Sequence, residues 1–326
     1  MAKLNMVKAL NLALLQEMER DDDIVILGED VGVDGGVFRV TEDLHRKFGG
    51  KRVIDSPLAE AGIIGTAVGM ALYGLKPVCE IQFSGFAFQC FHQIENHCAR
   101  YRTRTQSRFH VPIVIRMPYG GGVRALEHHS ESEEQYYAHM SGLKIVIPSG
   151  PRNARALLVA ALRDPDPVIF FEHKALYHAA KEEVPDESET MPIGRAHVDR
   201  EGRDLTLIAW GAMVRVAREA ADVLRAEDGA SVEIVDLLTV SPLDRETLVR
   251  SVAKTGRAMI VHEAPKSFGP GAELAASIME GAFLSLEAPI RRVTAYDVPF
   301  PGFAREKANV PDATRVVAAA RETLAY

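Results

Sequence analysis

The 326-residue sequence has few cysteines and no long apolar run. Cys79, Cys90 and Cys98 are odd in number and contain no CxxC pair, which excludes a disulfide framework and a zinc ribbon. The longest uncharged stretch spans residues 61–75, short of the ~20 residues that a membrane span requires. The acids among residues 17–23 do not suit a transit peptide. We therefore expect a cytoplasmic protein with reduced thiols.

The sequence also lacks a cationic excess, because 38 lysines and arginines stand against 45 aspartates and glutamates. A net charge of −7 argues against nucleic acid as a partner, since binding phosphates requires clustered positive charge. Neither a Walker loop, a GxGxxG fingerprint nor an HExxH motif is present, and the glycines at 120–122 lack the lysine of a phosphate loop. The histidines do not converge at the spacing of a metal site, so metal catalysis by this chain is not expected.

Short β-branched runs alternate with helix-length segments along most of the chain, which predicts an α/β fold with a parallel sheet covered by helices on both faces. In the first half the expected strands are 24–27, 53–54, 77–81, 113–116, 144–147 and 168–171. In the second half they are 205–209, 232–235, 259–261 and 290–293, with helices near 212–227, 271–285 and 312–325. Acids, prolines and turn formers separate the two halves. We predict a first domain over 1–185, a linker over 186–203 and a smaller α/β domain over 204–326.

Glu60 is the first candidate for chemistry. It follows Asp55-Ser56-Pro57, where Ser56 is a good helix cap and Pro57 suits the first helical position. In that frame Glu60 lies one place beyond the capping-box position, so its carboxylate is not committed to the helix amides. The alternative is an acid favoured by the helix dipole, which contributes ~0.3–1 kcal/mol.

Two further segments leave alternatives open. Gly62, Gly65 and Gly69 share one helix face, which indicates close helix packing either inside the domain or at a subunit interface. Residues 127–132, EHHSES, follow the glycine loop between a strand and a helix, where His129 could face a ligand crevice. A polar, solvated loop is an equally good interpretation of that segment from its residues alone.

Several motifs together resemble the β chains of the decarboxylase component of 2-oxo acid dehydrogenase complexes. The resemblance covers nearly the whole chain in order. It rests on ILGEDVG at 26–32, DSPLAEAGIIGTAVGMAL at 55–72, EIQFSGF at 80–86, EHHSES at 127–132, DPVIFFEHKALY at 166–177, VDLLTVSPLD at 235–244, KTGRAMIVHEAP at 254–265 and LEAPIRRV at 286–293.

The resemblance implies a transketolase-like architecture: a domain that binds the pyrimidine ring of thiamin diphosphate, followed by a transketolase C-terminal-like domain. In this family a separate α chain supplies the diphosphate-binding domain and most of the magnesium site. The sequence agrees, because Asp34-Gly35-Gly36 lacks the leading glycine of the GDG motif and no suitable asparagine follows. The implied assembly is an α2β2 heterotetramer docked on a dihydrolipoamide acyltransferase core with its lipoyl domain.

The same resemblance implies roles for individual residues. Glu60 matches the glutamate that hydrogen-bonds the aminopyrimidine ring and promotes its imino form, which activates the thiazolium carbon. His129 matches the histidine that acts during acyl transfer to the lipoyl arm, and Phe86 matches the aromatic residue on the pyrimidine. Glu29 matches an acid of the tunnel that couples two active sites, but Gln89 stands where some relatives carry another acid, which argues against a proton relay. A structural potassium site would map to Ile113, Ala161, Asp164 and Asp166.

The sequence therefore predicts a β subunit that, with an α subunit, decarboxylates a 2-oxo acid and reductively acylates lipoyl groups. EHHSES, FFEHKALY and VHEAP look closest to chains that act on branched-chain 2-oxo acids. A pyruvate or acetoin dehydrogenase β subunit is the alternative. A self-sufficient thiamin enzyme and a non-enzymatic α/β scaffold or cofactor-binding module are the competing hypotheses, although 326 residues leave no room for the third domain of the former.

Overall fold

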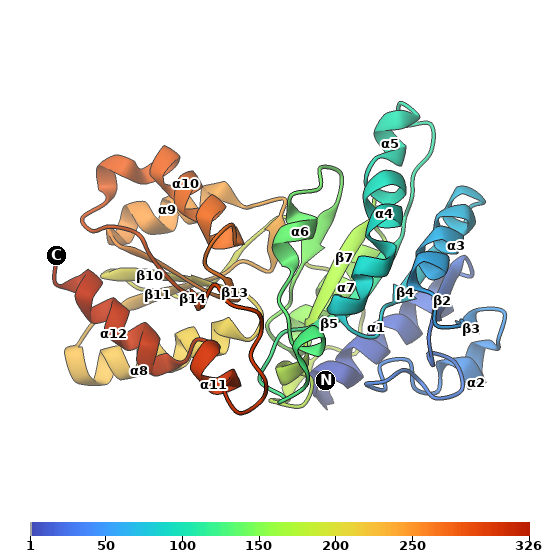
Figure 1. Cartoon of the computed structure of the whole chain (residues 1–326), viewed down its shortest axis with the longest axis horizontal. Coiled ribbons are helices and arrows are strands. Elements are labelled where there is room, and N and C mark those ends of the chain that lie inside the picture. The colour runs from blue at the N-terminus through green and yellow to red at the C-terminus, as the bar shows by residue number, and fades with distance from the viewer. Residues whose placement is uncertain (1) are drawn as a thin grey trace.

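Two sheets organise the protein, whose structure is a computed structural model that describes residues 2–326 (Figure 1). The first sheet has seven strands in the order β12-β6-β7-β5-β4-β2-β3. All of its pairs are parallel except that of β12 with β6. The bounds are β2 Ile24–Gly28, β3 Val53–Asp55, β4 Lys76–Glu80, β5 Val114–Tyr119, β6 Lys144–Val146, β7 Val168–His173 and β12 Thr239–Ser241. The six strands predicted for the first half of the chain are confirmed.

Helices cover both faces of this sheet (Figure 1). On one face α1 (Met6–Arg20) packs against α7 (Pro151–Leu162). On the other lie α3 (Glu60–Leu72), the 3-10 helix η1 (Ser84–Cys90), α4 (Phe91–Gln93), the π-helix η2 (Ile94–Ala99) and α5 (Tyr101–Arg104). Every residue of β2, β5 and β7 is buried, as expected for parallel strands covered on both sides.

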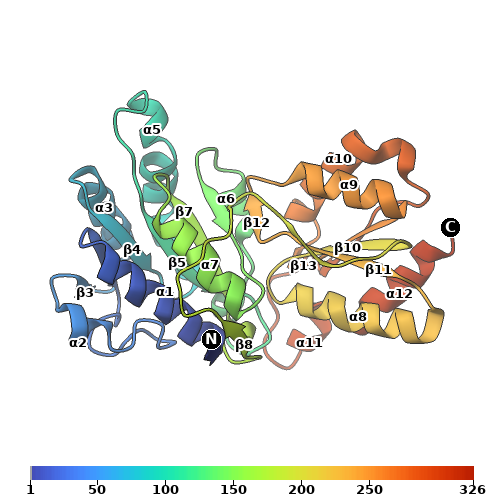
Figure 2. The same ribbon diagram turned by 180° about the vertical axis from the view of Figure 1, so that it is seen from behind.

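The second sheet has the order β14-β13-β10-β11-β9 and is parallel except at β9. Its strands are β9 His197–Arg200, β10 Leu205–Ala209, β11 Val232–Asp236, β13 Ala258–Pro265 and β14 Arg291–Ala295. One face carries α8 (Met213–Asp228) and α12 (Ala313–Leu324), and the other carries α9 (Arg245–Thr255) and α10 (Pro270–Ala282), followed by η5 (Phe283–Ser285) (Figure 2). The four strands and three helices predicted for this half are present.

The segment expected to be a linker, 186–203, contains strand β9, so it is not irregular throughout. Strand β9 was not predicted, because its sequence HVDR is charged and its residues, at the edge of the sheet, are at most partly buried. Just before it, β8 (Glu182–Val184) pairs with β1 (Ala2–Leu4) at the start of the chain. The domain limits themselves remain a prediction.

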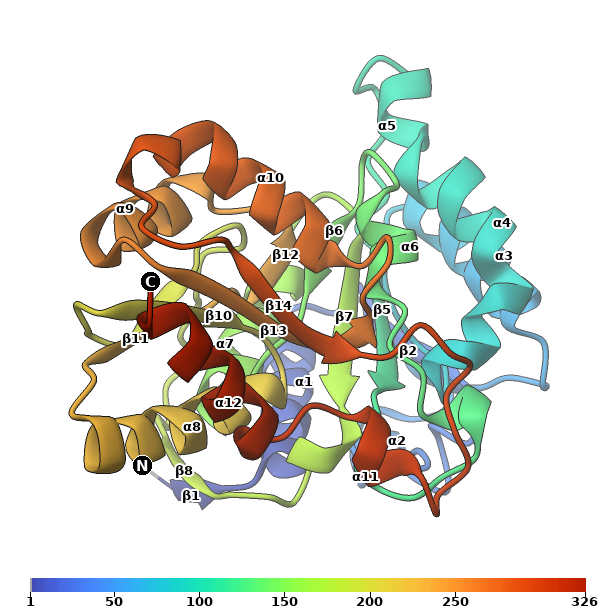
Figure 3. The ribbon, with the colours of Figure 1, turned by 60° about the vertical axis from the view of Figure 1, so that its left-hand side comes forward.

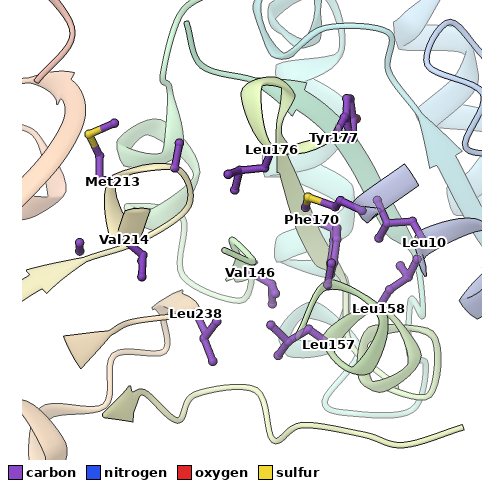
Figure 4. Close-up of a cluster of buried hydrophobic side chains, with 14 of the residues drawn as sticks. Leu10, Val146, Leu157, Leu158, Phe170, Leu176, Tyr177, Met213, Val214 and Leu238 are labelled. Atoms are coloured by element: carbon purple, nitrogen blue, oxygen red, sulfur yellow. The ribbon is translucent and has the colours of Figure 1, made fainter. Parts of the chain in front are cut away.

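The two halves are joined more closely than a flexible linker would join them. Strand β12 belongs to the second half of the sequence, yet it forms the edge of the first sheet. One buried cluster contains Val146, Leu157 and Phe170 together with Met213 and Leu238 (Figure 4). This continuous core fixes the orientation of the two halves, which determines what lies between them.

Short elements complete the fold. Helix α2 (Leu44–Phe48) lies beside β3 at the edge of the first sheet, and η3 (Glu127–His129), α6 (Glu134–Ala138), η4 (Lys174–Leu176) and α11 (Glu306–Asn309) lie nearer the second half (Figure 1). Figure 3 shows α11 and the loop that follows β14 reaching across toward the first sheet. No helix among residues 2–326 is both long and apolar enough to cross a membrane.

Candidate active site

Glu60 is the first residue of α3 and is only 6% exposed. The prediction that Ser56 caps this helix is wrong, because the helix begins after Ala59. The backbone N–H of Ser56 instead donates to the carbonyl of Gly28 at 2.9 Å, which extends the path of β3 beside β2. Glu60 therefore lies at the positive end of the α3 dipole, near the carboxyl ends of β2 and β3.

Glu29 follows β2 directly and forms an acidic pair with Glu60. Its side chain is buried, and its Oε1 finds no hydrogen-bond partner in the described part of the chain. Burial raises the pKa of Glu29, and the nearby charge of Glu60 raises that pKa further. The structure thus brings together the two acids that the resemblance singled out.

Phe86 and His129 also lie close together. Helix η1 carries Phe86 and packs against η3, which carries His129. The ring of His129 lies 5.2 Å from that of Phe86 and 4.3 Å from that of Phe83, both edge to face. Gly85 permits this approach, because a Cβ there would lie 2.2 Å from the carbonyl oxygen of His128.

One ring nitrogen of His129 has no hydrogen-bond partner in the described residues. Its Nδ1 is buried and makes no hydrogen bond within residues 2–326. Burial lowers the pKa of His129, and the charges of His128 and Lys174 lower it further. The imidazole is therefore neutral at physiological pH and able to exchange a proton with a bound group.

Glu60 and the aromatic pair belong to one region of the molecule. Helices α3 and η1 are in contact, and the charge of Glu60 acts on Cys90 at the end of η1. Burial and that charge raise the pKa of the Cys90 thiol to about 12, so the cysteine is inert here. A site with aromatic rings, two carboxyl groups and a neutral imidazole can receive a flat heteroaromatic ring with polar edges.

Two acids of the second half hold the glycine loop that leads to η3, and sequence reasoning missed this role for both. Glu263 on β13 accepts a hydrogen bond from the N–H of Gly121 at 2.6 Å through Oε1. Glu306 on α11 accepts from the N–H groups of Gly122 and of Arg124, the latter at 2.9 Å. Both carboxylates are buried. We call these two residues the loop clamp. Glu263 lies in the quoted motif VHEAP, which was the available signal.

His173 and Lys174, at the end of β7, complete the support of this loop. The Nε2 of His173 lies 2.5 Å from Oε2 of Glu263. The ammonium of Lys174 donates to the carbonyl of Gly120 at 2.6 Å and lies 5.8 Å from the ring centre of Phe83. Burial lowers the pKa of Lys174 to about 8. Both residues lie in the motif DPVIFFEHKALY at 166–177, but sequence spacing does not reveal the contacts that they make with this loop.

Of the four residues predicted for potassium, Ala161, Asp164 and Asp166 lie at the corner between α7 and β7. Ile113 lies beside this corner, because its carbonyl accepts from the N–H of Val168 at 2.9 Å. The carboxylate of Asp164 pairs with Lys144 at 2.6 Å, and that of Asp166 accepts from Arg102 at 2.6 Å. Both carboxylates therefore already form ion pairs, so a cation at this corner would have to bind backbone carbonyl groups. No group of three or more His, Cys, Asp or Glu side chains within residues 2–326 has the arrangement of a metal site.

Comparison with known proteins agrees with this geometry. Residues 2–179 match the family "Transketolase, pyrimidine binding domain", and residues 194–316 match "Transketolase, C-terminal domain". The chain is 49% identical to "Pyruvate dehydrogenase E1 component subunit beta" of Acholeplasma laidlawii, covering 99% of this chain and 98% of that protein. It is 48% identical to the protein of the same name from Staphylococcus epidermidis over 100% of both chains.

A solved structure shares the fold. "Split gene transketolase, inactive beta4 tetramer" superposes with a TM-score of 0.80 at 24% identity, covering 99% of each chain. Family match, full-length relatives and fold agree with one another. The chain belongs to the family of β subunits of the thiamin-diphosphate-dependent decarboxylase component of 2-oxo acid dehydrogenases, enzymes in which a β subunit works together with an α subunit.

Proposed function

We propose that this chain is the β subunit of a pyruvate dehydrogenase, which with its α subunit decarboxylates pyruvate and transfers the acetyl group to a lipoyl arm. The names of relatives that are 48–49% identical over the full length support pyruvate. They do not support the branched-chain substrate that the sequence motifs favoured. The observation that carries the proposal is the meeting of Glu60, Glu29, Phe86 and His129 at one end of the first sheet.

The substrate is tested by a profile of initial rates for the coexpressed α and β chains with pyruvate, branched-chain 2-oxo acids and acetoin. We expect the highest kcat/KM with pyruvate. A higher kcat/KM with a branched-chain 2-oxo acid would indicate a branched-chain 2-oxo acid dehydrogenase, as the sequence motifs favoured. A higher kcat/KM with acetoin would indicate an acetoin dehydrogenase.

Each site residue has a proposed task. Thiamin diphosphate, when bound, supplies the electron sink for loss of carbon dioxide. Glu60 holds a proton at the polar edge of the cofactor's pyrimidine ring, and Phe86 packs against the face of that ring. Neutral His129 would take up a proton and deliver it to the lipoyl sulfur that is released as a thiol when the acyl group is transferred. Glu29 lies beside Glu60, and the charge of Glu60 contributes to the raised pKa of Glu29.

The proposed site is shared between two chains. This chain lacks the GDG motif and distant asparagine that hold diphosphate and magnesium in complete thiamin enzymes, so we assign both functions to the α subunit. The assembly we propose is an α2β2 heterotetramer bound to a dihydrolipoamide acyltransferase core. Calorimetry tests this: the αβ pair binds thiamin diphosphate with magnesium, and the β chain alone does not. Binding by the lone chain would indicate a self-sufficient enzyme, and absence of 2-oxo acid turnover in both would indicate a scaffold.

We also propose that the corner formed by Ile113, Ala161, Asp164 and Asp166 binds potassium through backbone carbonyls. The turn after α7, in which the N–H of Asp164 donates to the carbonyl of Ala161 at 3.2 Å, supports this by bringing carbonyl groups close together. Hard cations prefer such oxygen ligands. Replacing potassium by a large organic cation in the buffer is expected to lower the melting temperature, and an unchanged temperature would argue against the site.

A further inference from the structure

A cavity lies between the two halves, and Glu29, Glu60, Phe86 and His129 do not line it. Its volume is about 210 Å³. The first half contributes the segment from Glu131 to Tyr136, which follows η3, and Phe88 of η1. The second half contributes Glu263 and the loop after β14. The cavity therefore depends on the fixed orientation of the two halves.

Glu133 is the unusual residue of this cavity. It is 3% exposed, and neither carboxylate oxygen makes a hydrogen bond to any atom of residues 2–326. The Oε1 of its neighbour Gln135, another lining residue, is also buried and without a partner in the described chain. Leaving a buried carboxyl unpaired is costly, so such a group calls for a ligand, water or another chain. Glu131 lies beside it and brings a second carboxyl group to the same wall.

Aromatic side chains form much of the remaining wall. Phe88 and Tyr136 pack edge to face with ring centres 5.7 Å apart. Tyr296 and Phe300 face them from the loop after β14. Tyr296 already holds a cation, because the guanidinium of Arg315 lies 4.8 Å from its ring centre. Aromatic faces together with carboxylates are the combination that attracts organic ammonium ions.

We propose that this cavity binds a primary ammonium group at the end of an alkyl chain. The ammonium pairs with the carboxyl groups of Glu133 and Glu131, and the alkyl chain lies among the aromatic rings. An anion is disfavoured by the carboxyl groups, and no set of three metal-ligating side chains occurs here or elsewhere in the described residues. The ammonium can come from a free alkylamine or from a lysine side chain of a partner chain.

The groups around Glu133 determine how binding depends on pH. They are Ser84 of η1, Glu131, Glu134 of α6 and Lys174 of η4. Burial, together with the nearby charges of Glu131 and Glu134, raises the pKa of Glu133 to about 8. Lys174 binds the carbonyl of Gly120, and no ion pair joins it to Glu133 in the described structure. Since an alkylammonium keeps its proton to a pH of about 10, it must displace the proton of Glu133, and its affinity increases as pH rises.

The proposal is tested on the coexpressed αβ enzyme by calorimetric titration with n-butylamine, with butan-1-ol as the uncharged control. We expect the amine to bind and the alcohol not to bind. Affinity is expected to be roughly 20-fold higher at pH 8.5 than at pH 6.5, with a proton released on binding at the lower pH. Glu133→Gln is expected to abolish this pH dependence and to weaken binding at least tenfold. Glu219→Gln, at an exposed position on α8, is the matched control and is expected to bind as the parent does.

A lysine of a partner chain gives a different result. In that case the αβ enzyme does not bind n-butylamine, and a carbodiimide cross-links Glu133 to a lysine of another chain in the parent but not in Glu133→Gln, as mass spectrometry of the digest would show. Either result supports an ammonium site. The proposal is overturned if the parent shows neither amine binding nor this cross-link, or if Glu133→Gln binds the amine as tightly as the parent. A melting curve of each variant establishes that it is folded.

Discussion

Single residues decide the chemistry, and Glu60 carries the largest part of it. Glu60 is the first residue of α3, after the cap residue Ala59, and it lies close to Glu29. Glu60→Gln preserves size and hydrogen bonding but removes the exchangeable acid. We expect kcat for decarboxylation, measured on the αβ enzyme with an artificial electron acceptor, to fall at least ~100-fold, in the range of general acid–base effects. Glu219→Gln is the control and is expected to keep the rate of the parent. A rate of Glu60→Gln within twofold of the parent would remove Glu60 from the mechanism.

His129 is expected to act at a later step than Glu60. Replacing it by alanine removes the neutral imidazole, but leaves Phe86 and Glu60 in place. We predict that reductive acylation of a free lipoyl domain falls by ~100-fold or more, whereas decarboxylation with the artificial acceptor falls by less than tenfold. Stopped-flow measurement of the two half-reactions distinguishes them. Equal losses in both would indicate that His129 has a general structural role.

At the scale of elements, the loop clamp fixes the segment that carries η3. Glu306→Ala removes two charge-assisted hydrogen bonds to the N–H groups of Gly122 and Arg124. Each such bond contributes ~1.5–3 kcal/mol, so we expect a melting temperature several degrees lower and a reductive acylation rate at least tenfold lower. The control is Glu322→Ala on α12, whose exposed carboxylate pairs with Arg291. If Glu306→Ala lowers stability and leaves acylation unchanged, the clamp does not position His129.

Elements were largely predictable, because buried parallel strands produce continuous β-branched runs such as IVIL in β2 and VIFF in β7. Strand β9 was missed because its charged residues lie at a sheet edge, and β12 was missed because its partner, β6, lies about ninety residues earlier. The true start of α3 was missed because the hydrogen bond from Ser56 to Gly28 depends on tertiary structure.

The candidate site was predictable only where a motif carried it. Motifs identified Glu29, Glu60, Phe86 and His129, and the structure places them in one region. Glu306 was not recognised as part of the site because its role depends on how the second half docks on the first. Lys174 was not recognised because its bond to the carbonyl of Gly120 joins two distant segments of the first half. Pairwise contacts of that kind leave no periodic pattern in a sequence.

At the scale of the whole molecule, buried groups between and within the two halves make stability depend on pH. His262 on β13 is fully buried and stacks on Trp210 with ring centres 5.1 Å apart. Burial, together with the charge of Arg292, lowers the pKa of His262 to about 3. The unfolded chain binds a proton at this residue near pH 6.5 while the folded protein does not. The stabilisation that the neutral form provides is present above pH 6.5 and is lost as pH falls toward 3.

We therefore predict that the melting temperature of the αβ enzyme falls between pH 6.5 and pH 4.5, and that His262→Phe reduces this fall, because phenylalanine retains the stacking and does not titrate. His45→Phe, on the surface helix α2, is the control and is expected to leave the pH dependence unchanged. Parallel melting curves of the three proteins across this pH range make the comparison. Identical pH dependence in the His262 variant and the parent would show that other groups control acid stability.

The central claim is that a carboxyl group of this chain reaches a cofactor whose diphosphate is held by another subunit. The most direct measurement is an experimental structure of the αβ enzyme with thiamin diphosphate bound. We predict a Glu60 oxygen within ~2.6–3.2 Å of a pyrimidine nitrogen, with Phe86 against the ring. A pyrimidine ring bound to a different acid, or a cofactor enclosed by the α subunit alone, would contradict the account.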